Sequence, residues 1–232
     1  MTERILLLGA TGGTGRIAMQ AALDAGLKVN AAARDPGDIE TTSADVRPVE
    51  VDVLSGDGLA QALEDVDAVV SALGVNNDPK TLLNPPPLYT DGHEAVLDAM
   101  AAKGLDRIVC ISALWSRSND FGPLWFRSGP VMALTRVYSQ MRSMERMLAA
   151  RPGLRYTAVR AGYLQDDEIL SAPAKAWADR PPEGHWLTRR ADLGRFLVDC
   201  VVKDEWVRAC PCYVQEADGR TIERKVAGLR TD

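Results

Sequence analysis

A glycine-rich turn close to the amino terminus limits this chain to a small set of folds. Four apolar residues, Ile5-Leu-Leu-Leu8, run directly into Gly9-Ala-Thr-Gly-Gly-Thr-Gly15, and an amphipathic helix pattern follows and ends at Gly26. In a strand, turn and helix of this order, the glycines allow a tight turn, close approach of a pyrophosphate, and close packing of helix and strand. Free N–H groups at the positive end of the helix dipole then hold the phosphates. The sequence therefore predicts a dinucleotide-binding loop; a glycine-rich turn that binds nothing is the alternative.

The residue at the end of the next apolar segment indicates which dinucleotide is bound. Arg34 follows the segment 29–33 and lies about 20 positions after Gly15. A site that prefers NAD needs a carboxylate there for the ribose 2′-hydroxyl, whereas a guanidinium suits a 2′-phosphate. We therefore expect NADP(H). Two alternatives stay open, because Asp35 can still reach a ribose and Arg34 can be an ordinary solvated charge.

The composition argues against several other classes of protein. At 232 residues the chain has the length of one large domain, and its net charge of −5 and pI of about 5.2 do not suit nucleic acid or an anionic membrane. It shows neither an apolar run of about 18 residues nor the pattern of a signal peptide. Cys110 and Cys200 lie in apolar segments, and Cys210-Pro-Cys212 lacks the second ligand pair of a zinc site. We expect no metal site and a reduced, cytoplasmic protein.

Strand and helix patterns alternate along the chain. After the first two strands, the expected strands cover 46–51, 68–72, 107–111 and 156–160, with a possible edge strand at 212–214, and the expected helices cover 89–103, 131–150 and 193–202. This alternation predicts an α/β fold, a Rossmann-like doubly wound parallel sheet with helices on both faces. We place one NAD(P)-binding domain with an integral substrate pocket at 1–215 and a charged C-terminal extension at 216–232.

Ligands of such sheets bind beyond the carboxyl ends of the strands. This rule selects the candidate cofactor contacts Gly9, Ala10, Thr11, Gly12, Thr14, Gly15, Arg16, Arg34, Asp52, Val53, Ala72, Leu73, Gly74 and Ser112, and places Tyr163 beyond the sixth strand. For Arg16 an outward-facing charge is the alternative, and for Asp52 an acid at a helix N-terminus.

Two loops at the same edge have the composition of pocket walls. The loop 76–87 contains three consecutive prolines, and the loop 114–130 carries Trp115, Phe121, Trp125 and Phe126. Aromatic side chains on a loop suit a flat, conjugated ligand. The alternative is a loop that folds back onto the core.

Short segments spread over residues 4 to about 215 form a specific combination. They are Gly9–Gly15, Ala33-Arg-Asp-Pro36, Val51-Asp-Val-Leu54, Ser71-Ala-Leu-Gly74 with Asn77-Asp78, Val109-Cys-Ile-Ser-Ala113, Gly153-Leu-Arg-Tyr-Thr-Ala-Val159, and Arg190-Ala-Asp-Leu-Gly194 with Phe196. In order and spacing they resemble the atypical short-chain dehydrogenase/reductase superfamily. Within it, the chain is most similar to the NAD(P)H-binding and NmrA-like group, and in particular to flavin reductase (biliverdin-IXβ reductase)-like proteins. The loop 114–130 and the charged tail fit this resemblance least.

The resemblance implies a doubly wound domain that binds NADPH and passes hydride to a flavin or another conjugated acceptor. Carried over by position, it implies a role for each of several residues: Gly9, Thr11, Gly12, Thr14 and Gly15 at the pyrophosphate, Arg34 at the 2′-phosphate, Asp52 and Val53 at the adenine, Leu73 and Gly74 on the ribose side, and Ser112 near the nicotinamide.

The catalytic pair of ordinary short-chain dehydrogenases is missing from this chain. Their Tyr-x-x-x-Lys motif protonates the developing alkoxide, and this chain has Tyr138-Ser-Gln-Met-Arg142 instead. In relatives with the full motif the lysine lies four residues before a helix glutamate, here Glu145, so Met141 takes the lysine position and Val137 the tyrosine position. Tyr138 is then displaced by about 100° around the helix, off the face that Met141 and Glu145 define. The candidate catalytic residues are Ser112, Tyr138 and Tyr163, and Met141 is a further candidate cofactor contact.

The missing acid favours one kind of acceptor. A flavin or quinone spreads the incoming charge over its rings and takes its proton from water, so the protein need only stack two rings. We therefore expect an NADPH-dependent reductase of flavins or other flat conjugated acceptors (quinone, tetrapyrrole), a monomer or weak homodimer with no nucleic-acid or membrane partner. The alternatives are a non-catalytic NADP(H)-binding NmrA-like redox sensor and, more weakly, a ketone reductase or epimerase that uses Tyr138.

Overall fold

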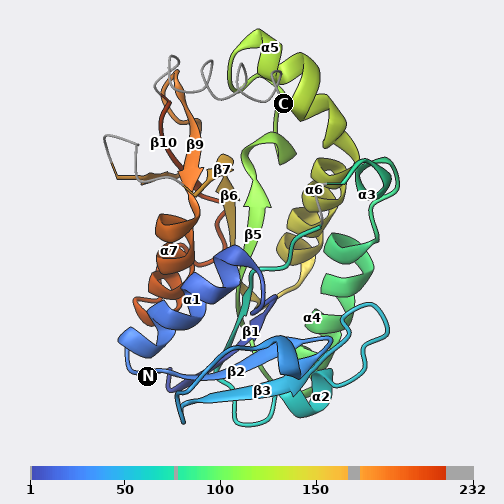
Figure 1. The fold of residues 1–232 in the computed structure, drawn as a ribbon, viewed down its shortest axis with the longest axis vertical. Coiled ribbons are helices and arrows are strands. Elements are labelled where there is room, and N and C mark those ends of the chain that lie inside the picture. The colour runs from blue at the N-terminus through green and yellow to red at the C-terminus, as the bar shows by residue number, and fades with distance from the viewer. Residues whose placement is uncertain (1, 76–77, 167–172, 218–232) are drawn as a thin grey trace.

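The computed structural model describes residues 2–75, 78–166 and 173–217 and contains one mainly parallel sheet between two layers of helices (Figure 1). The strand order is β3-β2-β1-β4-β5-β6-β10-β9-β7, and β8 pairs with β10. The strands are β1 (Arg4–Leu8), β2 (Lys28–Ala33), β3 (Val46–Glu50), β4 (Ala68–Ser71), β5 (Arg107–Ala113), β6 (Arg155–Ala161), β7 (Tyr163–Gln165), β8 (Lys175–Trp177), β9 (His185–Arg189) and β10 (Cys212–Glu216). This is the predicted Rossmann-like doubly wound fold in a single domain.

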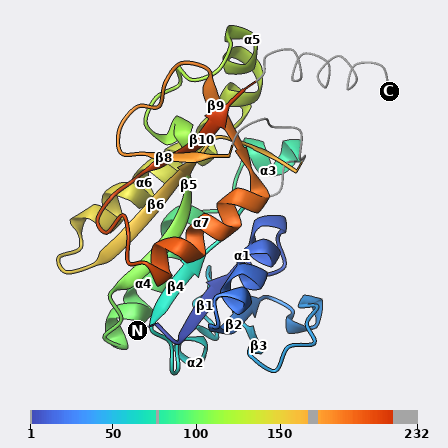
Figure 2. The ribbon, with the colours of Figure 1, turned by 90° about the vertical axis from the view of Figure 1, so that its left-hand side faces the viewer.

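Helices cover both faces of the sheet, which explains why its central strands are apolar without alternation. Helices α1 and α7 lie on one face, and α4 and α6 lie on the other (Figures 1 and 2). The four leucine and isoleucine residues of β1 are at most 1% exposed, because those pointing to either face meet a helix layer. The helices are α1 (Gly13–Asp24), α2 (Leu59–Ala62), α3 (Pro79–Leu83), α4 (His93–Ala102), α5 (Leu124–Phe126), α6 (Thr135–Ala150) and α7 (Arg190–Val202).

The predicted core strands are confirmed, whereas the starts of three expected helices were wrong. The helix expected over 193–202 starts three residues earlier, at Arg190. The helix expected over 89–103 begins with a wide, π-helical turn at Leu88–Gly92, and α4 itself starts at His93. The helix expected over 131–150 starts at Thr135, because a π-helical turn with Pro130 inside it precedes the helix. Strands β7, β8 and β9 were not predicted, and residues 218–232 of the expected charged extension lie outside the described residues.

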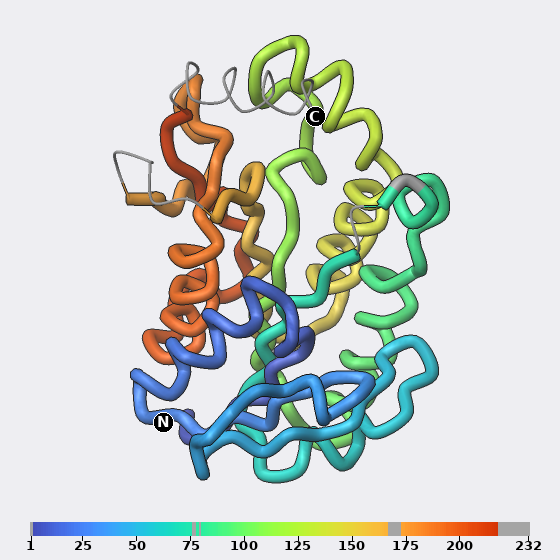
Figure 3. The backbone as a smooth tube through the Cα atoms, viewed as in Figure 1, coloured from blue at the N-terminus to red at the C-terminus, as the bar shows by residue number. Residues whose placement is uncertain are grey.

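The parallel register brings the ends of β1, β4, β5 and β6 to one edge of the sheet, as the chain tracing in Figure 3 shows. Leu8 pairs with Ser71, Ser71 with Cys110, and Ser112 with Arg160. The segments that follow these residues in the chain are those in which the sequence places its candidate contacts. Within the described residues, no helix is long and apolar enough to cross a membrane, and no group of three or more His, Cys, Asp or Glu side chains could hold a metal ion.

Candidate functional site

The turn between β1 and α1 has the geometry of a phosphate loop. Gly9 has a positive φ of 75°, and a Cβ atom there would lie 2.7 Å from the carbonyl oxygen of Ala72. A Cβ atom on Gly15 would lie 2.0 Å from the carbonyl oxygen of Gly9, so only glycine allows the helix to start this close to the strand. Gly12 is exposed, and a Cβ atom there would meet only the Gly9 oxygen, at 3.4 Å. Two glycines therefore shape the loop, and a third leaves its surface open.

The start of α1 is available to an anion. The helix has no side-chain cap and no acidic residue in its first turn. The first of its N–H groups to donate a backbone hydrogen bond is that of Arg16, to the carbonyl oxygen of Gly12. Among the described residues no acceptor takes the N–H groups of Gly13, Thr14 and Gly15. Unpartnered N–H groups at the positive end of a twelve-residue helix fit a diphosphate. The loop therefore suits the dinucleotide that the sequence predicted.

The adenosine side of the predicted site lies beyond β2 and β3. Arg34 is exposed directly after β2, and no described carboxylate forms an ion pair with it. The Asp35 side chain accepts a hydrogen bond from Gly37 N at 2.8 Å and caps its own turn. Asp52 likewise accepts from Leu54 N at 2.9 Å, and Val53 is buried. One oxygen of the Asp35 carboxylate, Oδ1, is therefore held by the backbone of its own turn.

A buried polar cluster joins β5, β6 and α6 below the carboxyl edge. Glu145 is 7% exposed, and its Oε1 atom accepts hydrogen bonds from Ser112 Oγ at 2.6 Å, Ser116 Oγ at 2.8 Å and Arg160 Nε at 2.9 Å. Arg160 Nη2 donates to Oε2 at 2.6 Å. Burial alone would lower the pKa of Arg160, but the hydrogen bonds and charge of Glu145 outweigh it and raise that pKa. The ion pair thus fixes the ends of two strands against one helix.

This cluster changes what Ser112 can do. The hydroxyl donates its single proton to Glu145, so only its lone pairs remain for another partner, and the residue is 1% exposed. The placement of Ser112 beside a nicotinamide stays a prediction. Sequence reasoning used Glu145 only to set the helix register and gave Arg160 no role. An ionisable residue on the buried face of a helix, with an arginine at the end of a core strand, was the available signal.

Tyr138 lies on the buried face of α6, so its predicted displacement from the face of Met141 and Glu145 was wrong. All three side chains are 7% exposed, and positions i, i+3 and i+7 share one stripe of a helix. The Tyr138 ring stacks on Trp115 with centroids 5.6 Å apart. Burial, with smaller contributions from Tyr89 and Tyr163, raises the pKa of its phenol above the ordinary value. A general acid needs a pKa near the working pH, so this environment opposes that role.

Most of the aromatic loop folds back onto the core, as the alternative interpretation held. Trp115, Phe121 and Phe126 are buried, and Trp115 Nε1 donates to the carbonyl oxygen of Phe121 at 3.1 Å. Phe126 contacts the ring of Tyr163 edge-on, with centroids 5.1 Å apart. Trp125 and Tyr163 remain 36% and 37% exposed. Of the predicted aromatic wall, Trp125 is therefore the ring left partly open to a ligand, and Tyr163, from β7, adds a second one.

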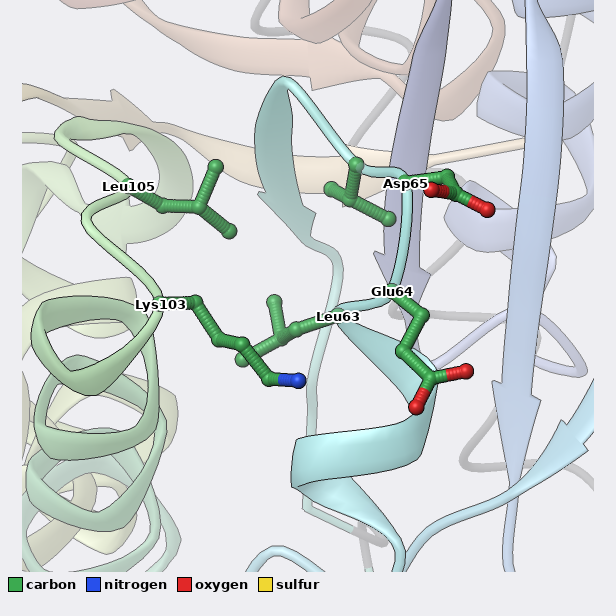
Figure 4. Close-up of a pocket in the computed structure, with 6 residues that line it drawn as sticks. Leu63, Glu64, Asp65, Lys103 and Leu105 are labelled. Carbon is green, nitrogen blue, oxygen red and sulfur yellow. The ribbon is translucent and has the colours of Figure 1, made fainter.

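Two hollows of the surface lie away from the phosphate loop. One, of about 350 Å³, is lined by Leu63, Glu64, Asp65, Val66, Lys103 and Leu105 (Figure 4). Its residues precede β4 and β5, so it lies at the edge of the sheet opposite the phosphate loop. The other, of about 130 Å³, lies under the aromatic loop and is lined by Leu114, Arg117, Ser118, Phe121, Asp179, Arg180 and Cys212.

The fold and the loop together define a dinucleotide-binding protein of the Rossmann class. A family model described as NAD(P)H-binding matches residues 9–204. The chain therefore belongs to this NAD(P)H-binding family, as the sequence resemblance predicted. An uncharacterized chloroplastic protein of Arabidopsis thaliana is 26% identical over 171 residues, which are 72% of this chain and 61% of that relative. The match thus spans about three fifths of the relative's length.

Solved structures with this fold include several reductase-like proteins. The oxidoreductase YlbE of Lactococcus lactis matches with a TM-score of 0.74 at 18% identity, over 92% of this chain and 91% of that one. A short-chain dehydrogenase/reductase of Veillonella parvula in complex with NADP has a TM-score of 0.71 at 16% identity, over 94% and 96%. ChuY, an anaerobilin reductase of Escherichia coli O157:H7, has a TM-score of 0.69 at 21% identity, over 93% and 98%. At these identities the likeness shows the shared fold.

Proposed function

We propose that this protein is an NADPH-dependent reductase that passes hydride to a flat, conjugated acceptor such as a flavin, a quinone or a tetrapyrrole. The observation that carries the proposal concerns helix α6, on which carbonyl reductases have their catalytic tyrosine and lysine: Tyr138, the tyrosine that this helix offers, is packed against Trp115. The resemblance implies Val137 and Met141 at the positions of the tyrosine and lysine of carbonyl reductases, and the neighbouring Tyr138 is buried and stacked on Trp115. An acceptor that stabilises charge in its own rings needs no acid from the protein.

The chain's own residues would bind and orient rather than transfer protons. Reduced nicotinamide supplies the hydride when it is bound. The N–H groups of Gly13, Thr14 and Gly15 would hold the diphosphate, and the apolar segment Ala72-Leu73 would lie along the cofactor. The partly exposed rings of Trp125 and Tyr163 offer faces on which a conjugated acceptor can stack.

The proposed preference for NADPH rests on the contacts of two neighbouring residues, Arg34 and Asp35. Arg34 is exposed beyond β2, whereas Asp35 is committed to Gly37 N at 2.8 Å. An exposed guanidinium at this position favours a 2′-phosphate over a ribose diol. The NADP bound to the Veillonella protein and the reductase name of ChuY are consistent with this proposal.

The test is a panel of acceptors at fixed NADPH concentration, with absorbance at the nicotinamide band as the measurement. Flavins, quinones and tetrapyrroles should accelerate NADPH oxidation, and aliphatic ketones and aldehydes should not. Turnover with ketones alone would contradict the proposal and favour a ketone reductase.

One observation favours a second candidate, a non-catalytic NADP(H) sensor of the NmrA-like kind. Trp115, Phe121 and Phe126 of the loop 114–130 are buried, so little of the predicted aromatic wall is left for an acceptor. A sensor would bind NADPH and NADP⁺ with different affinities and oxidise NADPH with none of the panel. Binding without turnover therefore separates this candidate from the reductase.

A further inference from the structure

Helices α1 and α7 lie side by side and parallel, with their first turns together at the carboxyl edge of the sheet (Figure 2). A Cβ atom on Gly194 would lie 2.6 Å from Ile17 Cγ2, so the missing side chain at that position lets the helices touch. One helical turn earlier on each helix, the next contact joins Gly13 and Arg190. There a Cβ atom on Gly13 would lie 3.4 Å from Arg190 Cδ and 3.8 Å from Arg190 Nε. The arginine is therefore fixed beside the first residue of the phosphate loop's helix.

The Arg190 guanidinium is held beside Gly13 by an ion pair with a solvent-exposed carboxylate, which an anionic ligand could replace. Its side chain is 30% exposed, and Nη1 donates to the carboxylate of Asp166, which is 76% exposed. Asp166 follows β7 directly and is itself open to water. An exposed ion pair of this kind contributes little to stability. The pair nevertheless keeps the guanidinium next to Gly13, whose N–H group has no acceptor among the described residues.

We propose that Arg190 is a direct cationic ligand of the cofactor's diphosphate, and that Asp166 holds the guanidinium beside the loop until the diphosphate replaces it. The inference rests on dinucleotide binding at the loop, which the proposed function includes. A diphosphate carries two negative charges, whereas the N–H groups of Gly13, Thr14 and Gly15 are neutral dipoles. A guanidinium adds charge-assisted hydrogen bonds that are shorter and stronger than those of neutral donors. Arg34, at the tip of β2, would serve the other end of the same cofactor.

The test compares the Kd values of NADPH and NADH, which share the diphosphate and differ in the 2′-phosphate. Each value is measured by calorimetry on the full chain at low ionic strength. Arg190→Gln should raise both Kd values by the same factor, about tenfold, whereas Arg34→Gln should raise only that of NADPH. Arg195→Gln, on the exposed side of the same helix, is the matched control and should leave both unchanged.

Asp166→Asn gives an independent and opposite prediction. Removing the competing carboxylate should lower both Kd values about threefold, and the effect should vanish when Arg190→Gln is also present. Thermal unfolding without cofactor checks that each variant is folded. If Arg190→Gln does not fold, the Kd values of the Asp166→Asn variant alone test the proposal. An Arg190→Gln Kd within twofold of the original, or an Asp166→Asn Kd raised as much as that of Arg190→Gln, would overturn the role of Arg190. If the unaltered chain binds neither dinucleotide, the proposed function itself fails.

Discussion

The phenol ring of Tyr138 lies over the indole of Trp115, with ring centroids 5.6 Å apart and planes inclined by 28°. This contact ties α6 to the turn that follows β5. Both residues are at least nine-tenths buried. The tyrosine is thus part of the packing between the helix and the aromatic loop.

Tyr138→Phe should therefore lower the reduction of flavins by less than about tenfold. An essential general acid contributes roughly 10²–10⁴ to the rate, whereas phenylalanine keeps the ring stack with Trp115. Steady-state NADPH oxidation with a flavin acceptor measures the effect. A thousandfold loss with unchanged NADPH affinity would contradict the acid-free mechanism and favour a ketone reductase with a Tyr-x-x-x-Arg pair.

The error about Tyr138 in the sequence argument was one of helix geometry. Tyr138 is displaced by about 100° from Val137, but positions 138, 141 and 145 follow the i, i+3, i+7 spacing of one helix stripe. The stripe was readable in the sequence, but the partner of Tyr138 was not. Trp115 reaches it only after β5 and α6 are packed together.

How well the other parts of the structure could be predicted depended on how far apart in the sequence their contacting residues lie. The unit of β1, loop and α1 is local, and each glycine there has a mechanical reason that the sequence alone reveals. The pair of Glu145 and Arg160 joins a helix to a strand, and it becomes visible only when Ser112 and Arg160 pair across β5 and β6. Strand β7 pairs with β9 through Tyr163 and Leu187, and three residues carry too short a pattern to predict that.

Arg34→Ala should remove the preference for NADPH. A charge-assisted contact contributes about 1.5–3 kcal/mol, so the unaltered chain should bind NADPH roughly tenfold to a hundredfold more tightly than NADH. Titration of both cofactors measures the ratio. Arg47→Ala, an exposed arginine on the neighbouring β3, is the control. Equal affinities in the unaltered chain, or an unchanged ratio in Arg34→Ala, would refute the assignment.

Gly12→Val should abolish binding of the dinucleotide while the chain stays folded. Gly12 has a φ of −73°, which any residue adopts, and its Cβ position meets only the Gly9 oxygen at 3.4 Å. A branched side chain would instead fill the open surface above the loop that the pyrophosphate needs. Calorimetry with NADPH and thermal unfolding without it give the two measurements. Wild-type affinity in this variant would mean that the phosphate loop has been misplaced.

His93 should make the stability of the fold depend on pH. The ring is 1% exposed and lies between Ser71 Oγ and the carbonyl oxygen of Leu88, both at 3.0 Å, and burial lowers its pKa from 6.5 to about 4. Because the Leu88 oxygen can only accept, Nδ1 donates to it and Nε2 accepts from Ser71. The neutral ring is therefore part of the packing between β4 and α4.

The sign of the effect follows from where the proton binds. Between pH 6.5 and about 4 the unfolded chain takes up a proton on His93 that the folded chain does not, so stability is fully present above pH 6.5 and falls with decreasing pH. The full loss is about 3 kcal/mol, at 1.36 kcal/mol for each pKa unit. Urea unfolding at several pH values between 7.5 and 4.5 measures the slope, and His93→Gln should flatten it. His185 is half-buried at the first position of β9, away from α4, and His185→Gln is the control variant, which should keep the slope of the unaltered chain. A slope that persists in His93→Gln would assign the pH dependence to other groups.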